Sequence, residues 1–156
     1  MIIMSKLDGI TVRIPTAEEF SGVLDLRWRV LDQPVGAQRK DAPSNTDVAE
    51  GTIHVAAFDG DRVVSTVRLD PRLGQDGPIY LVRRMATDPD YRRRGIGGAV
   101  LTEAEHIAAV RGATGIVLHA RLGAVAFYES MGYTATGHTE IHDGEATPEM
   151  IKSISS

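Results

Sequence analysis

The sequence predicts a single α/β domain, a mixed β-sheet flanked by helices, and three observations carry this prediction. Hydrophobic residues make up 42% and charged residues 24% of the 156 residues, as in ordinary globular domains. Short β-branched runs occur in pairs joined by turn residues, which predicts antiparallel hairpins. A segment of helical period followed by a short apolar run predicts one parallel strand–helix–strand unit. The length suits one domain, which we place over residues 1–156.

The N-terminal third begins with one strand and one helix. Apolar and polar residues alternate over residues 10–14, which predicts a strand. Thr16 and Glu19 have the spacing of a capping box, so we expect a helix from there to about Val30. Residues 32–50 contain proline, glycine, serine and asparagine without periodicity. They predict a loop with at most one short helix.

A hairpin and a central strand follow. The runs 53–58 and 62–69 are apolar and β-branched, and Asp-Gly-Asp at 59–61 joins them, which predicts a hairpin. Residues 71–78 begin and end with proline and predict a loop. Residues 79–87 predict a central strand, which the following Asp-Pro pair ends.

The C-terminal half predicts two further helices and three strands. Residues 97–111 carry apolar side chains at helical spacing, and residues 116–118 form a short buried strand. Residues 124–131 predict a short helix, and residues 133–141 and 145–154 a last hairpin around an Asp-Gly turn. The predicted order is therefore β-α-β-β-β-α-β-α-β-β, in a mixed sheet of six to seven strands.

A basic glycine loop lies at 88–101, between the central strand and the next helix. Backbone N–H groups of such a loop converge on one point, and the helix dipole adds positive potential, which predicts a phosphate site. A Walker-type loop needs Gly-Lys-Ser/Thr, but Ala99 follows the last glycine. A dinucleotide fingerprint needs glycine where Val100 stands and an acidic residue after the next strand, where the sequence has Leu-His-Ala-Arg. Both patterns therefore fail.

The third pattern is Arg92-x-x-Gly95-x-Gly97, which resembles the acyl-coenzyme A loop of the GNAT superfamily of N-acetyltransferases. A second motif follows one strand later. Residues 120–133, with Phe127-Tyr128 followed by Gly-Tyr, resemble the second signature of that superfamily. Two motifs in the correct order are more specific than either alone. The resemblance implies an acyl-CoA N-acyltransferase fold and acetyl-CoA as co-substrate.

The resemblance also implies how the cofactor is held. Two parallel strands, about 79–87 and 115–120, are expected to splay apart, so that backbone groups of Met85 and Thr87 bond the pantetheine amides. The pyrophosphate is expected on the amides of residues 93–98, with the Arg92 side chain adding charge-assisted bonds. Arg93 and Arg94 either reach the ribose phosphate or face solvent, and Phe127 is a core aromatic beside this site. The implied cofactor-binding set is Met85, Ala86, Thr87, Arg92, Arg93, Arg94, Gly95, Ile96, Gly97, Gly98 and Phe127.

Two residues are the candidate catalytic groups. By resemblance, Tyr128 is the general acid that protonates the departing thiolate. Many relatives carry a glutamate base on the central strand, but Arg83 and Arg84 stand there in this chain. His119, at the end of the neighbouring strand, is a candidate to relay a proton through water, or else a hydrogen-bonded structural histidine. His54 is a weaker second candidate for the base.

The expected reaction is direct transfer of an acetyl group from acetyl-CoA to a primary amine of a small molecule or peptide, within a ternary complex. The chain contains no cysteine, which excludes a cysteine-thioester intermediate. A non-catalytic acyl-CoA sensor or subunit is the alternative, because the strand glutamate is missing. Transfer of a longer acyl group is a third possibility. Carboxylates in the loop at 32–50 and in the last hairpin weakly favour a cationic acceptor, unless they are ordinary solvated side chains.

Composition bounds the remaining functions. The net charge of −4 argues against a nucleic-acid partner, and no apolar run is long enough for a membrane span. A cytoplasmic location is therefore expected. The five histidines lack the spacing of a zinc motif, so no metal is expected, and His138 and His142 are expected at the surface. Because relatives often pair through late strands, a homodimer is one expected assembly.

Overall fold

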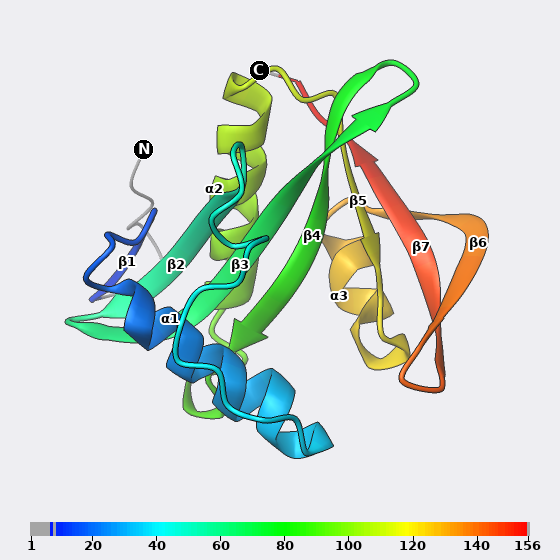
Figure 1. The fold of residues 1–156 in the computed structure, drawn as a ribbon. Helices are drawn as coiled ribbons and strands as arrows, with labels where there is room; N and C mark the ends of the chain where they lie inside the picture. Colours follow the sequence, from blue (N-terminus) through cyan, green and yellow to red (C-terminus); the bar gives the residue numbers. More distant parts are fainter. Residues whose placement is uncertain (1–6, 8, 156) are drawn as a thin grey trace.

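A seven-stranded mixed sheet organises the chain, and its strand order is β1-β2-β3-β4-β5-β7-β6 (Figure 1). The computed structural model describes residues 7 and 9–155. The strands are β1 (Ile10–Arg13), β2 (Ile53–Asp59), β3 (Arg62–Gly74), β4 (Gly77–Thr87), β5 (Gly115–His119), β6 (Thr134–His142) and β7 (Glu145–Ser153). The α-helices are α1 (Phe20–Arg27), α2 (Ile96–Val110) and α3 (Val125–Ser130). Their order along the chain confirms the predicted one.

Helices cover both faces of the sheet, because β2 places alternate side chains on opposite sides (Figure 1). Val55 and Ala57 join the cluster that α2 covers, in which Leu101 is also buried. Ala56 and Phe58 join the cluster that α1 covers. Among the described residues, no helix combines the length and the apolarity needed to cross a membrane. The two clusters hold the sheet between α1 and α2.

One neighbouring pair of strands in the sheet is parallel, and it lies at the centre. β4 and β5 run in the same direction, whereas the other neighbours pair antiparallel. The last hairpin does not simply extend the sheet in chain order. Instead, β7 lies between β5 and β6, so β6 becomes the outer strand. The hairpin therefore completes the sheet beside the parallel pair.

The first helix begins three residues later than the capping pattern predicts. Its N-cap is Glu19 rather than Thr16, and α1 begins at Phe20. The Glu19 carboxylate still accepts a hydrogen bond from the Thr16 N–H at 2.8 Å, but Arg13 binds both of its oxygens at 2.7 Å. This pairing holds the segment as a turn against β1. The helix then continues through a π-helical turn (Trp28–Asp32) and a 3₁₀ turn (Gln33–Val35).

The predicted loop at 71–78 is instead the end of a long hairpin. β3 runs to Gly74 and β4 begins at Gly77, so the turn is only two residues long. Pro71 is tolerated in β3 because β2 stops pairing at Leu69. No strand on that side needs the N–H group that proline lacks. Pairing with Tyr80 on β4 therefore keeps Pro71 in a strand, although the proline favoured a loop in the sequence.

Candidate active site

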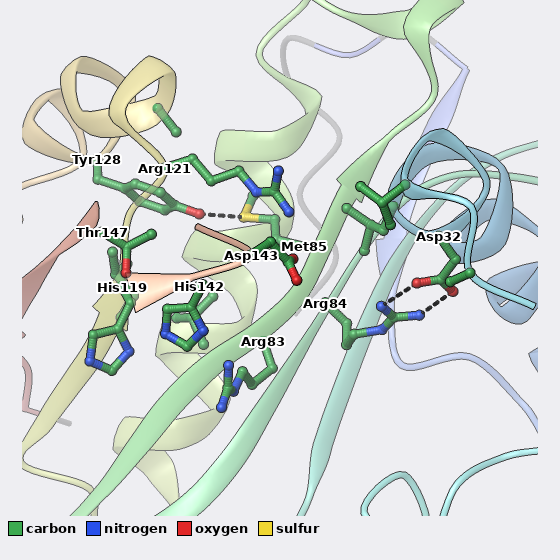
Figure 2. A pocket seen from close by; sticks show the side chains of 16 residues that line it. Asp32, Arg83, Arg84, Met85, His119, Arg121, Tyr128, His142, Asp143 and Thr147 are labelled. Atoms are coloured by element: carbon green, nitrogen blue, oxygen red, sulfur yellow. Dashed lines mark hydrogen bonds and ion pairs between the residues drawn. The ribbon is translucent and has the colours of Figure 1, made fainter. Parts of the chain in front are cut away.

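The site lies where β4 and β5 separate. The two strands pair from Ile79–Gly115 to Leu81–Val117, after which β4 continues to Thr87 while β5 ends at His119. The predicted splay is therefore present. A cavity of about 540 Å³ opens there (Figure 2). Its lining is Leu31, Asp32, Val35, Ala37, Val82, Arg83, Arg84, Met85, Leu118, His119, Arg121, Ala124, Tyr128, His142, Asp143 and Thr147.

A bulge in β4 shapes one wall of this cavity. The register with β3 passes from Arg83 to Ala86 with Arg84 and Met85 unpaired, and Arg84 has a φ of 53°. Such a conformation is costly for a non-glycine residue and is retained where neighbouring contacts enforce it. The Asp32 carboxylate provides that contact, accepting two hydrogen bonds from the Arg84 guanidinium at 2.8 and 2.7 Å. The bulge leaves backbone groups of β4 outside the ladder, beside the cavity.

Tyr128 on α3 directs its hydroxyl across the splay toward the bulge (Figure 2). The hydroxyl donates to the sulfur of Met85 at 3.6 Å, a weak acceptor. Burial raises the pKa of Tyr128 above its ordinary value of 10. The phenol is therefore protonated at neutral pH, and its proton is available to a better acceptor in the cavity. A phenol with an available proton at a cavity meets the first requirement for general acid catalysis.

The loop before α2 has the geometry of an anion site. Arg93 and Gly95 adopt positive φ values of 64° and 77°, which turns successive N–H groups to one side. Within the described residues, the amides of residues 93–98 donate no hydrogen bond, whereas the next amide, that of Ala99, bonds Gly95. A Cβ on Gly97 would lie 3.3 Å from the Thr87 Oγ1, so glycine keeps the helix start close to the end of β4. The residues present therefore fit a pyrophosphate.

The three arginines of the loop differ in their contacts. Arg92 and Arg93 make no hydrogen bond or ion pair through their side chains to any residue that the structure describes. Arg94 donates to the Asp90 carbonyl at 3.3 Å, and its guanidinium lies 5.0 Å from the centre of the Tyr91 ring. Arg92 and Arg93 are therefore free to bind phosphate oxygens. Arg94 is partly held by the preceding turn.

His119 lies at the far end of the cavity with a second histidine that the sequence placed at the surface. His142 lines the cavity, and its Nε2 lies 3.0 Å from the Glu140 Oε2. The His119 Nε2 is buried without a hydrogen-bond partner among the described residues, 3.5 Å from the same carboxylate oxygen. His138 is 61% exposed, as expected. His142 is 38% exposed, as expected for a surface position, and the pairing of β6 with β7 brings that side chain to the cavity beside β5.

His119, Glu140 and His142 also form the one group of described residues that could hold a metal ion. The metal-ligating atoms of the three side chains lie within 4.8 Å of one another. The sequence spacing 119, 140, 142 gave no indication of it, because the three residues come from two separate strands.

The second candidate base, His54, lies outside the cavity. Its Nε2 lies 2.8 Å from the Asp47 carbonyl and its Nδ1 3.2 Å from the Arg27 guanidinium. Burial lowers the pKa of His54 below its ordinary value. We therefore assign His54 to the packing of the loop at 32–50 and not to proton transfer.

Two of the carboxylates that favoured a cationic acceptor, both in the loop at 32–50, are engaged in ion pairs. Asp47 is buried against Arg27 and Arg68, each at 2.9 Å, and Asp41 pairs with Arg39 at 2.7 Å. Burial acts to raise the pKa of Asp47, but the Ser44 N–H and the two guanidiniums outweigh it, so its pKa lies well below the ordinary value. Asp47 therefore holds the loop to Arg68 on β3, whereas Asp41 pairs within the loop.

Other cavity residues gave no signal in the sequence. Asp32 ends the π-helical turn after α1, and Asp143 and Thr147 lie in the last hairpin, outside both motifs. Arg121 lies within the second motif but is not one of its characteristic residues. Arg83 and Arg121 are exposed, and their side chains have no hydrogen bond or ion pair within the described part of the chain. Two unpaired positive charges therefore lie at the cavity.

Comparison with known proteins agrees with this geometry. A profile of the acetyltransferase (GNAT) domain matches residues 49–135, more than half of the chain. The chain is 30% identical over 132 residues to probable N-acetyltransferase 14 of Xenopus tropicalis, in a match that covers 83% of this chain and 60% of that protein.

Solved structures show the same fold. An acyl-CoA N-acyltransferase from Pseudomonas aeruginosa superposes with a TM-score of 0.73 at 21% identity, covering 92% of this chain and 97% of that one. An aminoglycoside 6'-N-acetyltransferase complexed with coenzyme A superposes with a TM-score of 0.71 at 19% identity, covering 91% and 96%. The predicted fold and family are confirmed: the chain belongs to the GNAT family of acetyltransferases, and its class is that of the acyltransferase enzymes.

Proposed function

We propose that the protein transfers an acetyl group from acetyl-CoA to a primary amine of a small molecule or peptide. The observation that carries the proposal is the position of the Tyr128 hydroxyl. It points into the opening between β4 and β5, at the end of the strand that leads to the anion-binding loop (Figure 2). A thioester laid along β4 with its pyrophosphate on residues 93–98 brings its sulfur toward this hydroxyl.

The cofactor-binding residues follow from the same placement. The amides of residues 93–98 and the Arg92 side chain bind the pyrophosphate, and Met85, Ala86 and Thr87 border the pantetheine. Thr87 is already fixed, because its Oγ1 lies 2.9 Å from the Ser65 Oγ. Phe127 is exposed rather than part of the core as expected, and it packs edge-on against Tyr128 at 5.1 Å between ring centres. The solved relative that carries coenzyme A supports acetyl-CoA as the co-substrate.

The chemical step is direct transfer. The amine nitrogen attacks the thioester carbonyl carbon, the C–S bond breaks, and the sulfur leaves as a thiolate that takes the Tyr128 proton. The nitrogen of the tetrahedral intermediate loses its proton to solvent, and His119, whose Nε2 has no hydrogen-bond partner among the described residues, is the proposed relay. Solvent then returns a proton to the Tyr128 phenolate. The chain has no cysteine, so no acyl-cysteine intermediate forms on this chain.

Binding without transfer is the competing function, and ligand-dependent melting tests the common first step. Acetyl-CoA, coenzyme A and NAD are compared by thermal shift, since a ligand that prefers the native state raises the melting temperature. We expect stabilisation by both coenzyme A forms and none by NAD. No shift with acetyl-CoA would remove the basis of the proposal.

The assembly is a separate expectation. β6 is the outer strand and mostly exposed, so a homodimer through this edge is proposed. Light scattering after size-exclusion chromatography measures the mass directly. A mass of one chain across the micromolar range would contradict it.

A further inference from the structure

Three neighbouring strands gather polar side chains on one face of the sheet, beside the cavity. His119 on β5 pairs in register with Glu149 on β7, and Thr147, two residues away on β7, pairs with Glu140 on β6. Directly paired residues, and residues two apart on one strand, project from the same face. His142 therefore shares this face with the others. The cluster is a consequence of inserting β7 between β5 and β6.

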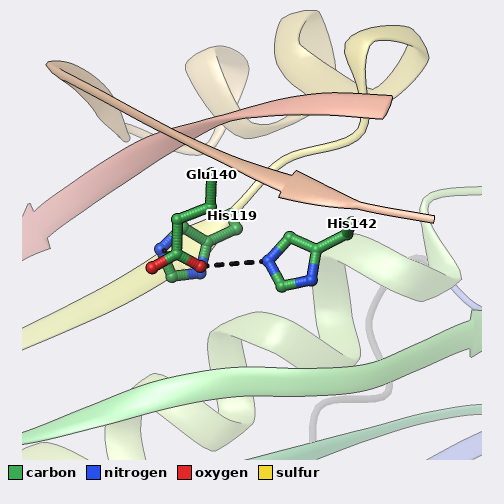
Figure 3. Close-up of side chains that lie close together, drawn as sticks. All are labelled: His119, Glu140 and His142. Carbon is green, nitrogen blue, oxygen red and sulfur yellow. Dashed lines mark hydrogen bonds and ion pairs between the residues drawn. The ribbon is translucent and has the colours of Figure 1, made fainter. Parts of the chain in front are cut away.

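Two distances within this cluster are close to those between ligands of one metal ion (Figure 3). The Glu140 Oε2 lies 3.0 Å from the His142 Nε2 and 3.5 Å from the His119 Nε2. Zinc bonds of about 2.0–2.1 Å in a tetrahedral site place neighbouring ligand atoms about 3.3 Å apart. The two histidine nitrogens lie within 4.8 Å of each other. A tetrahedral site therefore requires the partly exposed His142 ring to move toward His119.

The His119 nitrogen supplies an independent observation. Its Nε2 is buried and has no hydrogen-bond partner among the described residues, although buried polar atoms are nearly always satisfied. It lies 3.6 Å from the Glu149 Oε2 as well as near Glu140. A Thr136 hydroxyl donates to the other Glu149 oxygen at 2.9 Å and so orients the carboxylate. A cation between the His119 nitrogen and the carboxylates of Glu140 and Glu149 would give that buried nitrogen a partner.

The geometry points to a divalent transition-metal site formed by His119, Glu140 and His142, with Glu149 or water as the fourth ligand. Two imidazoles with one or two carboxylates are the ligands of zinc and its neighbours, whereas magnesium and calcium prefer all-oxygen sites. The ion would lie in the wall of the cavity, close to the unpaired Arg83 and Arg121. Binding of the ion does not depend on the proposed acetyl transfer, and an ion on the His119 Nε2 would exclude that nitrogen from the proposed proton relay.

Calorimetry with Zn²⁺ tests the site on the full, tag-free chain after removal of metals by a chelator. We expect saturable binding of one ion per chain at neutral pH. Glu140→Gln and His142→Ala should each weaken it more than tenfold, whereas His106→Ala, an exposed histidine on α2, should leave it unchanged. Visible absorption of the Co²⁺ form should show the intense bands of a tetrahedral site in the wild type and lose them in Glu140→Gln.

Two results would overturn the site. One is the absence of stoichiometric Zn²⁺ binding to the wild-type chain, which would leave the cluster as a set of histidine–carboxylate hydrogen bonds. The other is binding that persists in both ligand variants. Glu140 is 43% exposed, so Glu140→Gln should fold normally, and a cooperative melt of each variant confirms this.

Discussion

The Tyr128 hydroxyl lies 3.6 Å from the Met85 sulfur and spans the gap where β4 and β5 part. Met85 reaches this position because the β4 bulge shifts it out of register with β3. The contact joins α3 to the bulge without engaging either group strongly. It therefore marks the point where a ligand can displace the sulfur and accept the phenolic proton.

Tyr128→Phe should lower the rate of acetyl transfer by about a hundredfold or more, since general acid catalysis contributes roughly 10²–10⁴-fold. The affinity for coenzyme A should change little, because the ring is retained. Steady-state rates and calorimetry measure the two quantities. Tyr80→Phe removes a hydroxyl from a buried core ring and is the matched control. An unchanged rate in Tyr128→Phe would remove the acid assignment.

The pH profile supplies a second check on Tyr128. Because burial raises its pKa above 10, the phenol stays protonated through neutral and mildly alkaline pH. The turnover rate at saturating substrates should therefore not fall with rising pH until above about pH 10. A decline centred near pH 8 would show that some other acid controls the leaving group.

Arg92→Ala should raise the dissociation constant for coenzyme A about tenfold or more, because a hydrogen bond to a charged group contributes about 1.5–3 kcal/mol. Calorimetry measures this at fixed ionic strength. Arg72→Ala is the control, since Arg72 is also exposed and lies at the opposite end of the β3–β4 hairpin. Equal affinity for coenzyme A in the two variants would show that Arg92 does not bind its phosphates.

Asp47→Asn should reduce the free energy of unfolding by about 3–5 kcal/mol, the cost of removing one partner from a buried ion pair. The Asp47 side chain is 5% exposed and bonds both Arg27 and Arg68. Asp41→Asn breaks an exposed ion pair in which the Asp41 side chain is 80% exposed, and it should cost no more than about 1 kcal/mol. Urea unfolding at neutral pH compares them. Similar losses in both variants would contradict the role assigned to burial.

Stability should also fall on acidification, with Asp47 contributing. Its folded-state pKa is depressed, so its stabilisation is complete above the unfolded value of about 3.9 and is lost as pH falls below it. Urea unfolding from pH 6 to pH 3 should show this loss in the wild type. The dependence should be shallower in Asp47→Asn, and parallel curves would argue against the depressed pKa.

Acceptors that carry a carboxylate near the amine should be preferred. Arg83 and Arg121 present unpaired guanidiniums at the cavity, whereas the Asp32 carboxylate is held by Arg84. Lysine should therefore have a KM several-fold lower than 1,5-diaminopentane, which lacks the carboxylate. Arg121→Gln should reduce the difference in KM between lysine and the diamine. Arg111→Gln, at the end of α2, should leave that difference unchanged. A lower KM for the diamine would instead support the earlier expectation of a cationic acceptor.

Local signals were enough to predict the element order and the glycine loop. Both depend on short-range physics, namely period, turn residues and glycine at positive φ, as at Gly95. The predicted loop at 71–78 was wrong because Pro71 occupies a stretch of β3 without a second neighbour. The start of α1 was wrong because Arg13 engages Glu19, a contact between two elements.

The residues around the cavity that lie outside the two motifs could not be predicted from the sequence for a related reason. His119, Glu140 and His142 meet only because β7 inserts between β5 and β6, a long-range choice of strand order. The carboxylate of Asp47 looked available for an acceptor until the fold buried it against Arg27. Motifs that bind a shared cofactor were local, whereas the surfaces that select an acceptor come from distant segments.

Amine-dependent release of coenzyme A thiol is the most direct test of the central claim. A thiol-reactive dye reports it cleanly, because the chain itself has no cysteine. With acetyl-CoA and a panel of primary amines, the proposal predicts thiol release that needs both enzyme and amine, matched by acetylated amine in the mass spectrum. Binding of acetyl-CoA without thiol release for any amine would contradict it and identify the protein as an acyl-CoA-binding subunit or sensor.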